Sequence, residues 1–182
     1  MILFSCNRFK NHLVWEDVKY DKNLKNHHEF KDMNRGYYYN PFLGDTNRYK
    51  KTCNIYYAII REKKKDMYAT ESDNYYCAAQ IFHDTLFVSI GRNDGFTADG
   101  LKINIVQKKF SIYPYLISDN ISDEKKETPS KVDGQHLVLN KPNYTIGDSI
   151  FGQFYLKMMY KPQDREFDRN VYWSGEFRCK ID

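Results

Sequence analysis

The sequence predicts a mainly β protein, an antiparallel β-sandwich of the immunoglobulin-like or a related type, with a barrel as the alternative. Short runs rich in branched and aromatic residues recur about every 8 to 15 residues, with turn residues between them. Aromatic residues make up 16% of the chain and are mostly tyrosine, which suits a half-covered sheet. Because no long amphipathic helix separates successive runs, a parallel sheet is not expected.

Length and charge narrow the class further. A chain of 182 residues fits one domain. Its 28 basic and 24 acidic residues are spread along the sequence and leave a net charge of only +4, so nucleic acid is not expected as a partner. No run approaches the roughly 20 apolar residues of a transmembrane helix.

The first residues carry a short motif. Leu3-Phe4-Ser5-Cys6 resembles the lipobox of bacterial lipoproteins, and the resemblance implies that Cys6 carries a lipid. Residues 1–20 would then be a signal remnant and tether before a single β-rich domain over residues 21–182. The chain lacks a basic n-region and an apolar run, so export would require a signal upstream of Met1. The alternative is a short apolar leader on a cytoplasmic protein.

One short helix is expected before the strands, from Leu24 to Arg35, ended by Gly36, although its many Asn and His residues favour helix only weakly. Within it, His27-His28-Glu29 is the densest group of potential metal ligands. Neighbouring side chains point in different directions, so this group predicts surface rather than a metal site.

Eight strands are predicted from residue type and alternation, and turn signals separate them. They are Cys53–Ile60, Tyr76–Phe82, Leu86–Ile90, Leu101–Ile105, Phe110–Ile117, Leu137–Leu139, Ile150–Met158 and Trp173–Ile181. Residues Arg61–Asp66 are expected to form a charged turn, and Ser118–Asp133 a mobile loop. Pro114 lacks a donor, so its strand should lie at an edge or bend there.

The last two strands predict a long hairpin and share a Gly-x-Phe step, at Gly152 and at Gly175. In the second strand Phe177 falls on the apolar register and Arg178 on the polar one. We therefore expect Phe177→Ala to be costly and Arg178→Ala to be nearly neutral.

The cysteines offer one covalent possibility. If the protein is exported, Cys53 and Cys77 could form a disulfide between neighbouring strands, whereas Cys179 falls on an apolar register and is expected in the core. The absence of a Cys-x-x-Cys motif gives a zinc or redox site little support.

The loop Arg92–Gly100 is the favoured binding loop, with Ser118–Asp133 as the other candidate. Phe96 beside Asp94 and Asp99 offers an apolar contact with a polar rim, although Phe96 could instead plug the core. The two carboxylates suit calcium, yet the spacing is not that of an EF-hand. No catalytic motif is present, so no catalytic residue, metal or cofactor is expected.

The pattern Asn-Lys-x-x-Tyr-x-x-Gly-Asp-x-x-x-Gly-x-Phe from Asn140 to Phe154, followed by Gly175-Glu-Phe177, resembles small lipoproteins of unknown function from Bacteroidetes-type bacteria. The resemblance implies a noncatalytic binding or structural module of the cell envelope, in the periplasm or at the outer membrane. Its lipid anchor would hold it to the membrane, and a protein partner is possible. An immunity-type protein that binds a toxin, and a small-ligand carrier or enzyme, remain alternatives.

Overall fold

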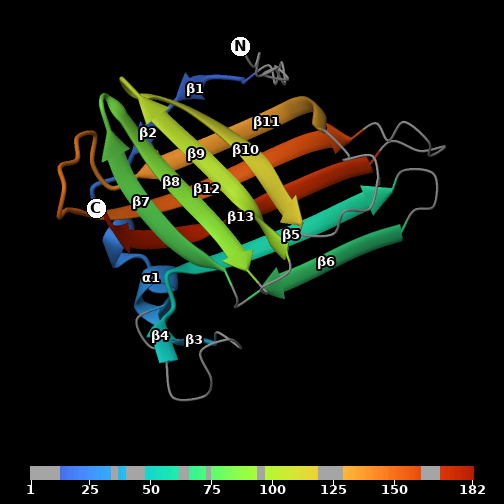
Figure 1. Cartoon of the computed structure of the whole chain (residues 1–182), viewed down its shortest axis with the longest axis horizontal. Coiled ribbons are helices and arrows are strands. Elements are labelled where there is room, and N and C mark those ends of the chain that lie inside the picture. Colours follow the sequence, from blue (N-terminus) through green and yellow to red (C-terminus); the bar gives the residue numbers. More distant parts are fainter. Residues whose placement is uncertain are drawn as a thin grey trace, which may run out of the picture.

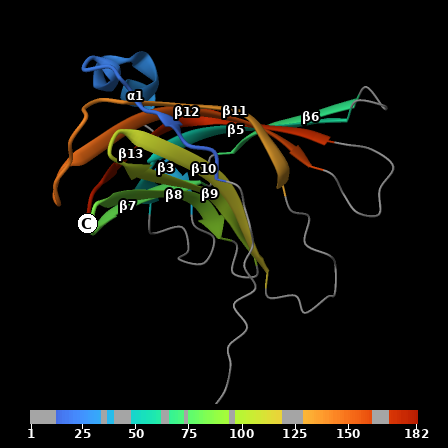
Figure 2. The same cartoon turned by 90° about the horizontal axis from the view of Figure 1, so that it is seen from above.

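Two β-sheets pack face to face in the computed structural model of the chain, and their strands cross obliquely (Figures 1 and 2). The structure describes residues 13–33, 37–39, 48–61, 66–72, 75–93, 97–118, 129–160 and 169–182. The two sheets that these residues form are not closed into a barrel. The predicted β-sandwich is confirmed.

The first sheet has five antiparallel strands in the order β1-β10-β9-β8-β7. Its strands are β1 (Glu16–Asp17), β7 (Tyr76–Phe82), β8 (Thr85–Asn93), β9 (Thr97–Val106) and β10 (Lys109–Ser118). Pro114 pairs with Leu101 of β9, whereas β1 reaches only Phe110 and Lys109 on the other side of β10. Pro114 therefore lies where β10 forms the edge of the sheet, as predicted.

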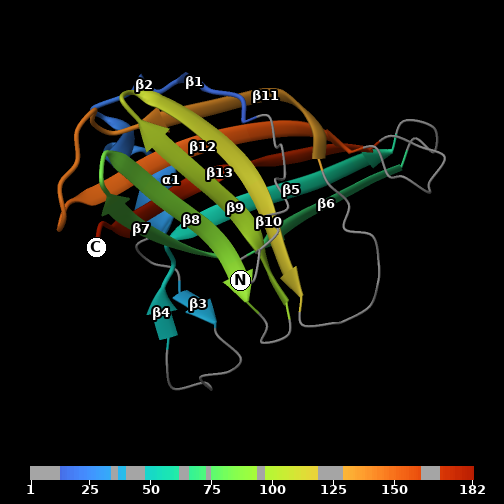
Figure 3. The ribbon, with the colours of Figure 1, turned by 45° about the horizontal axis from the view of Figure 1, so that its top comes forward.

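The second sheet has six strands in the order β2-β11-β12-β13-β5-β6, and only the β2–β11 pair is parallel. Its strands are β2 (Lys19–Tyr20), β5 (Cys53–Arg61), β6 (Asp66–Ser72), β11 (Pro129–Leu139), β12 (Ser149–Tyr160) and β13 (Arg169–Lys180). A separate hairpin of β3 (Tyr37–Tyr39) and β4 (Arg48–Lys50) lies apart from it in Figure 3.

Two strand predictions are corrected by this sheet. β6 was not expected, because its sequence of mixed polar residues lacks a clear apolar face. β11 begins at Pro129, so residues 129–133 belong to a strand and not to the loop expected over Ser118–Asp133. Residues 119–128 of that loop lie outside the described part of the chain.

The core lies between the sheets, and two of its largest buried rings come from the hairpin of β12 and β13. Phe154 and Phe177 are buried, which confirms the register expected for both strands. Gly152 lies opposite Phe177, and Phe154 lies opposite Gly175, so each glycine faces the phenylalanine of the other strand. The Phe177 ring occupies the space that a side chain at Gly152 would fill, whereas at Gly175 that space is taken by the backbone of Asn54 and Ile55.

Residues 16–20 form a strap that joins the two sheets. β1 pairs with the first sheet and β2 with the second, and Val18 between them donates its amide to the carbonyl of Lys108 at 2.8 Å. The buried Gln135 strengthens the same seam, because it accepts from the amide of Ile112 and donates to the carbonyl of Val14. The strap thus belongs to the sandwich and not to the tether expected over residues 1–20.

Two short helices cover one end of the outer face of the six-stranded sheet (Figure 2). They are η1 (Leu24–Asn26) and α1 (His28–Met33), separated by the extended backbone of His27, in place of the single helix expected over residues 24–35. Their apolar residues pack on Val138 and Phe151, and Phe30 meets Phe151 edge to face at 5.4 Å. Neither helix is long and apolar enough to cross a membrane, and the described residues contain no other helix.

Candidate functional site

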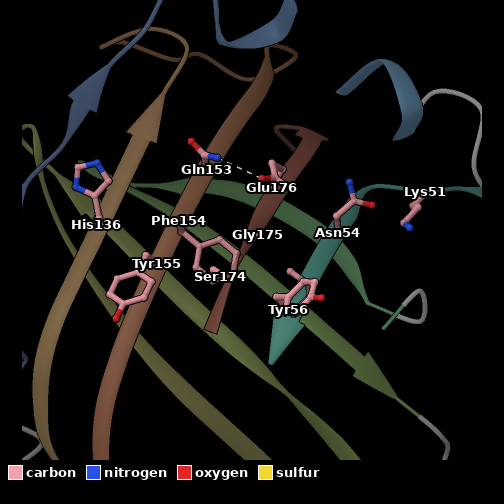
Figure 4. A pocket seen from close by; sticks show the side chains of 11 residues that line it. Lys51, Asn54, Tyr56, His136, Gln153, Phe154, Tyr155, Ser174, Gly175 and Glu176 are labelled. Atoms are coloured by element: carbon pink, nitrogen blue, oxygen red, sulfur yellow. Dashed lines mark hydrogen bonds between the residues drawn. The ribbon is translucent and has the colours of Figure 1, made fainter. Parts of the chain in front are cut away.

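A shallow pocket of about 590 Å³ lies on the outer face of the six-stranded sheet, beyond the end that the helices cover (Figure 4). Its lining comes from four adjacent strands, β11, β12, β13 and β5, with one residue from the segment before β5. The lining residues are Lys51, Asn54, Ile55, Tyr56, His136, Gln153, Phe154, Tyr155, Ser174, Gly175 and Glu176.

Antiparallel pairing arranges the solvent-facing residues of this pocket in two rows across the strands. His136, Tyr155, Ser174 and Tyr56 form one row, since each is the register partner of the next. Gln153, Glu176 and Asn54 form the second row, two residues further along each strand. We call the side chains of these two rows the tyrosine face.

Glu176 has the most perturbed environment on the tyrosine face. Burial raises the pKa of its carboxyl group, while a hydrogen bond that Gln153 donates from Nε2 to Oε1 at 3.2 Å opposes this shift. The carboxylate is therefore half-buried at the centre of a sheet, with a neutral amide as its neighbour. A carboxylate kept in such a place at a cost in stability is typical of functional sites.

Charged residues border the tyrosine face on the side away from the helices. Lys157 lies over the ring of Tyr172 and pairs with Asp133 at 3.3 Å, and Lys131 pairs with the same carboxylate at 2.9 Å. The two ammonium groups hold the pKa of Asp133 below its usual range. This border therefore holds two lysines against one aspartate.

The other end of the tyrosine face is bordered by Arg178, which the sequence suggested was dispensable. Its guanidinium donates to the carbonyl oxygens of Met33 at 3.5 Å and Lys51 at 3.4 Å. Arg178 therefore links the end of α1 to the segment before β5. We no longer expect its removal to be neutral.

The predicted binding loop is only partly described. Asp94 and Phe96 lie outside the described residues. The carboxylate of Asp99 accepts hydrogen bonds from Tyr75 at 2.7 Å and Arg92 at 2.6 Å, and Arg92 also lies over the ring of Tyr75. Asp99 thus holds the end of the five-stranded sheet together, on a different sheet from the tyrosine face.

Three cysteines meet at the other seam of the sandwich. Cys53, Cys77 and Cys179 are free thiols in the structure. Burial raises the pKa of Cys77, and its contact with Cys179 adds to this shift. The disulfide predicted between Cys53 and Cys77 stays a prediction, and Cys179, which was expected in the core, is half-buried beside Cys77. Cys6, the expected lipid anchor, lies outside the described residues.

The histidine cluster is divided between two local contacts with carboxylates. His27 pairs with Asp21 at 3.3 Å, and His28 pairs with the adjacent Glu29 at 3.2 Å. Across the described ranges, no three His, Cys, Asp or Glu side chains are placed to hold a metal ion together.

The motif from Asn140 to Phe154 builds the connection between β11 and β12. The side-chain oxygen of Asn140 accepts from the Tyr144 hydroxyl at 2.7 Å and from the amide of Phe151 at 3.0 Å. Asp148 accepts from Thr145 and pairs with Lys141 at 2.7 Å. These roles are structural, so the motif positions β12, the central strand of the pocket. Of its residues, only Gln153 and Phe154 line the pocket.

Sequence reasoning missed the tyrosine face as a site. The alternation in β13 places Ser174 and Glu176 on the same polar register as Arg178. Tyr155 and His136 belong to the same kind of polar register on neighbouring strands. What the sequence lacked was strand order, which places these registers side by side and leaves them uncovered by the helices.

Comparison of this chain with protein-family models, with curated proteins and with solved structures finds no match. The functional interpretation therefore depends on the chemistry of the site.

Proposed function

We propose that this chain is a noncatalytic binding module, held at a membrane surface by a lipid on Cys6, and that the tyrosine face is its ligand-binding surface. The observation that carries the proposal is the pocket itself, in which aromatic and polar side chains from four central strands face solvent together. A concave surface with a few convergent polar groups is the usual form of a ligand site.

The noncatalytic part is supported by the spacing of the two titratable groups at the centre of the pocket. His136 stands on β11 and Glu176 on β13, with β12 between them and in different rows. Two strand spacings alone separate their Cα atoms by about 10 Å, and the offset between the rows adds to this, so the sheet does not pair them as an acid and a base. The Glu176 carboxylate instead accepts from Gln153, an amide that can neither give nor take a proton at neutral pH.

Binding at the tyrosine face can be tested with fluorescently labelled protein and the envelope fraction of cells that carry the gene. We expect the wild type to bind, and Tyr155→Ala to bind about tenfold more weakly, because truncating a central aromatic anchor costs more than 1 kcal/mol. Tyr76→Ala is the matched control, since Tyr76 is similarly exposed but lies on β7 of the other sheet. Equal binding by both variants would contradict the site.

The anchor is tested separately. The full-length protein, expressed with its upstream sequence, should fractionate with membranes and carry a lipid detectable by mass spectrometry. Cys6→Ser should release it, because a protein without acyl chains loses the apolar area that holds it to the bilayer. A wild-type protein without lipid would contradict the anchor while leaving the tyrosine face untouched.

A further inference from the structure

We propose that the ligand of the tyrosine face is an uncharged saccharide chain, stacked on Tyr56 and Tyr155 and hydrogen bonded by the row of Gln153, Glu176 and Asn54. This inference rests on the proposed function and adds the class of ligand. Four features of the face lead to it.

The first feature is a pair of accessible tyrosine rings in one row. Tyr56 is 52% exposed and Tyr155 is 39% exposed, although both stand on interior strands of the sheet. Ser174 lies between them in the register, so the backbones of the two tyrosines are two strand spacings, about 10 Å, apart. Both side chains stand on the same face of the sheet (Figure 4). The small serine leaves the space between the rings open. Such spacing allows one ligand to contact both rings along its length.

The second feature is the polar row beside the rings. Gln153 and Asn54 each carry an amide donor and acceptor, and the Glu176 carboxylate accepts only. The hydrogen bond from Gln153 holds the carboxylate in place within the row. Sugar hydroxyl groups donate and accept at once, and a sugar ring presents C–H groups on its faces. A saccharide therefore satisfies the row with its hydroxyl groups while its apolar face lies on the tyrosines.

The third feature is the balance of charge. The lining contains one lysine, Lys51, and one glutamate, Glu176, so its formal charge is zero with His136 neutral. A phosphate or a nucleic acid is recognised by clusters of Lys and Arg, which this lining does not offer. Strongly basic or acidic peptides would likewise find no opposite cluster. An uncharged polar ligand best matches a lining whose formal charge is zero.

The fourth feature is the position of the pocket on the sheet. Its floor is formed by β12 and β13, and both strands are hydrogen bonded to neighbours on either side. A peptide that binds by strand addition needs a free edge, and none exists here. A helical peptide needs an apolar groove, whereas the tyrosine face has two amides, a carboxylate and an imidazole. The favoured ligand is therefore not a peptide.

The first experiment measures the migration of the purified full-length chain in native gels that contain soluble polysaccharides. Uncharged glucans, mannans, galactans and xylans are the probes, and polygalacturonate is the anionic comparison. We expect at least one uncharged polymer to retard the wild type. Tyr56→Ala and Tyr155→Ala should weaken that binding by about tenfold, whereas Tyr155→Phe, which keeps the ring, should retain most of it. Tyr76→Ala is again the control, and thermal melts confirm that each variant folds.

The second experiment separates this inference from the proposed function. The envelope fraction is treated with periodate, which cleaves vicinal diols, or with a protease, before labelled protein is added. Binding lost after periodate but kept after protease supports the saccharide. Binding that is lost after protease alone and also lost in Tyr155→Ala overturns the saccharide and leaves the proposed function standing. No binding by the wild type in either experiment overturns both.

Discussion

Replacing Gly152 with alanine should destabilise the domain because of a single contact. A Cβ atom built on Gly152 would lie within 2.1 Å of Cζ and 2.4 Å of Cε1 of Phe177. Both positions are fully inside the core, where the Phe177 ring has no exposed surface and packs near Phe154. The ring cannot turn away without displacing other core residues, so Gly152→Ala is an overpacking substitution.

Overpacking of this kind costs about 1–3 kcal/mol. In a domain of this size each kcal/mol lowers Tm by about 2–4 °C. We therefore expect Gly152→Ala to lower Tm by roughly 2–12 °C, measured by circular dichroism and by urea unfolding. Gly134→Ala is the matched control, because Gly134 also lies in a strand and its added Cβ would meet nothing within 4 Å. A gain of up to about 1 kcal/mol is expected there, from the smaller entropy of the unfolded chain.

A double-mutant cycle tests the named contact directly. Phe177→Ala alone should cost about 3–5 kcal/mol. In the double variant the ring is absent, so the new methyl group at position 152 no longer clashes and fills part of the cavity. The double variant should then lose about 1–3 kcal/mol less stability than the sum of the two single losses. If Phe177→Ala is too unstable to measure, Phe177→Leu serves the same cycle. Strict additivity, or equal losses in Gly152→Ala and Gly134→Ala, would refute the reasoning.

Three further predictions follow from single groups. Burial raises the pKa of Glu176, so the protonated carboxyl favours the folded state and this contribution is lost as pH rises through that pKa. Glu176→Gln, which keeps the side chain neutral, should therefore raise Tm at pH 7. The gain should vanish below about pH 4, where the carboxyl is itself protonated. Arg178→Ala should cost about 1 kcal/mol in urea unfolding, because two backbone carbonyls lose a donor, whereas the exposed Lys180→Ala should stay within about 0.5 kcal/mol. Burial raises the pKa of Cys53 to about 12, so iodoacetamide should label it, by mass spectrometry, only after unfolding.

Outcomes opposite to these would locate the error. A Glu176→Gln gain that persists at low pH would mean that the carboxylate is not the source of the effect. Equal losses in Arg178→Ala and Lys180→Ala would mean that Arg178 does not link α1 to the segment before β5. Rapid labelling of Cys53 in the folded protein would place that thiol at an accessible edge.

The strands that alternation predicted well are those with one face in the core. In β12 and β13 the buried and exposed positions alternate along most of the strand, and the register read from the sequence was correct. The hairpin of β7 and β8 was also located well, because a short polar break at His83-Asp84 separates two clear runs. The local sequence pattern is enough to locate a strand when its residues are alternately buried and exposed.

The elements that sequence reasoning missed obtain their structure from neighbours. β6 pairs along its length with β5, at the edge of the sheet. The strap at residues 16–20 has only two paired residues on each side, too few for any periodic signal. The helical segment was predicted as one piece because the sequence does not reveal the extended backbone at His27 that divides it.

The candidate site was missed for a related reason. A solvent-facing Tyr155 or Gln153 is ordinary in isolation, and a half-buried Glu176 cannot be recognised without its neighbours. Their combination depends on non-consecutive strands, since β5 joins β13 across more than a hundred residues of sequence. Strand order is a long-range property, and no short window of the sequence contains it.

The strap has a mechanical consequence under the proposed N-terminal anchor. A force on the residues before Glu16 acts first on β1 and β2. These strands pair with both sheets, but each does so through only two residues. All of the tyrosine face except His136, which stands on β11 beside β2, is carried by β12, β13 and β5, strands joined by long ladders to their neighbours. Under such a pull the strap would separate from the sheets first, while the longer ladders of β12, β13 and β5 stayed paired.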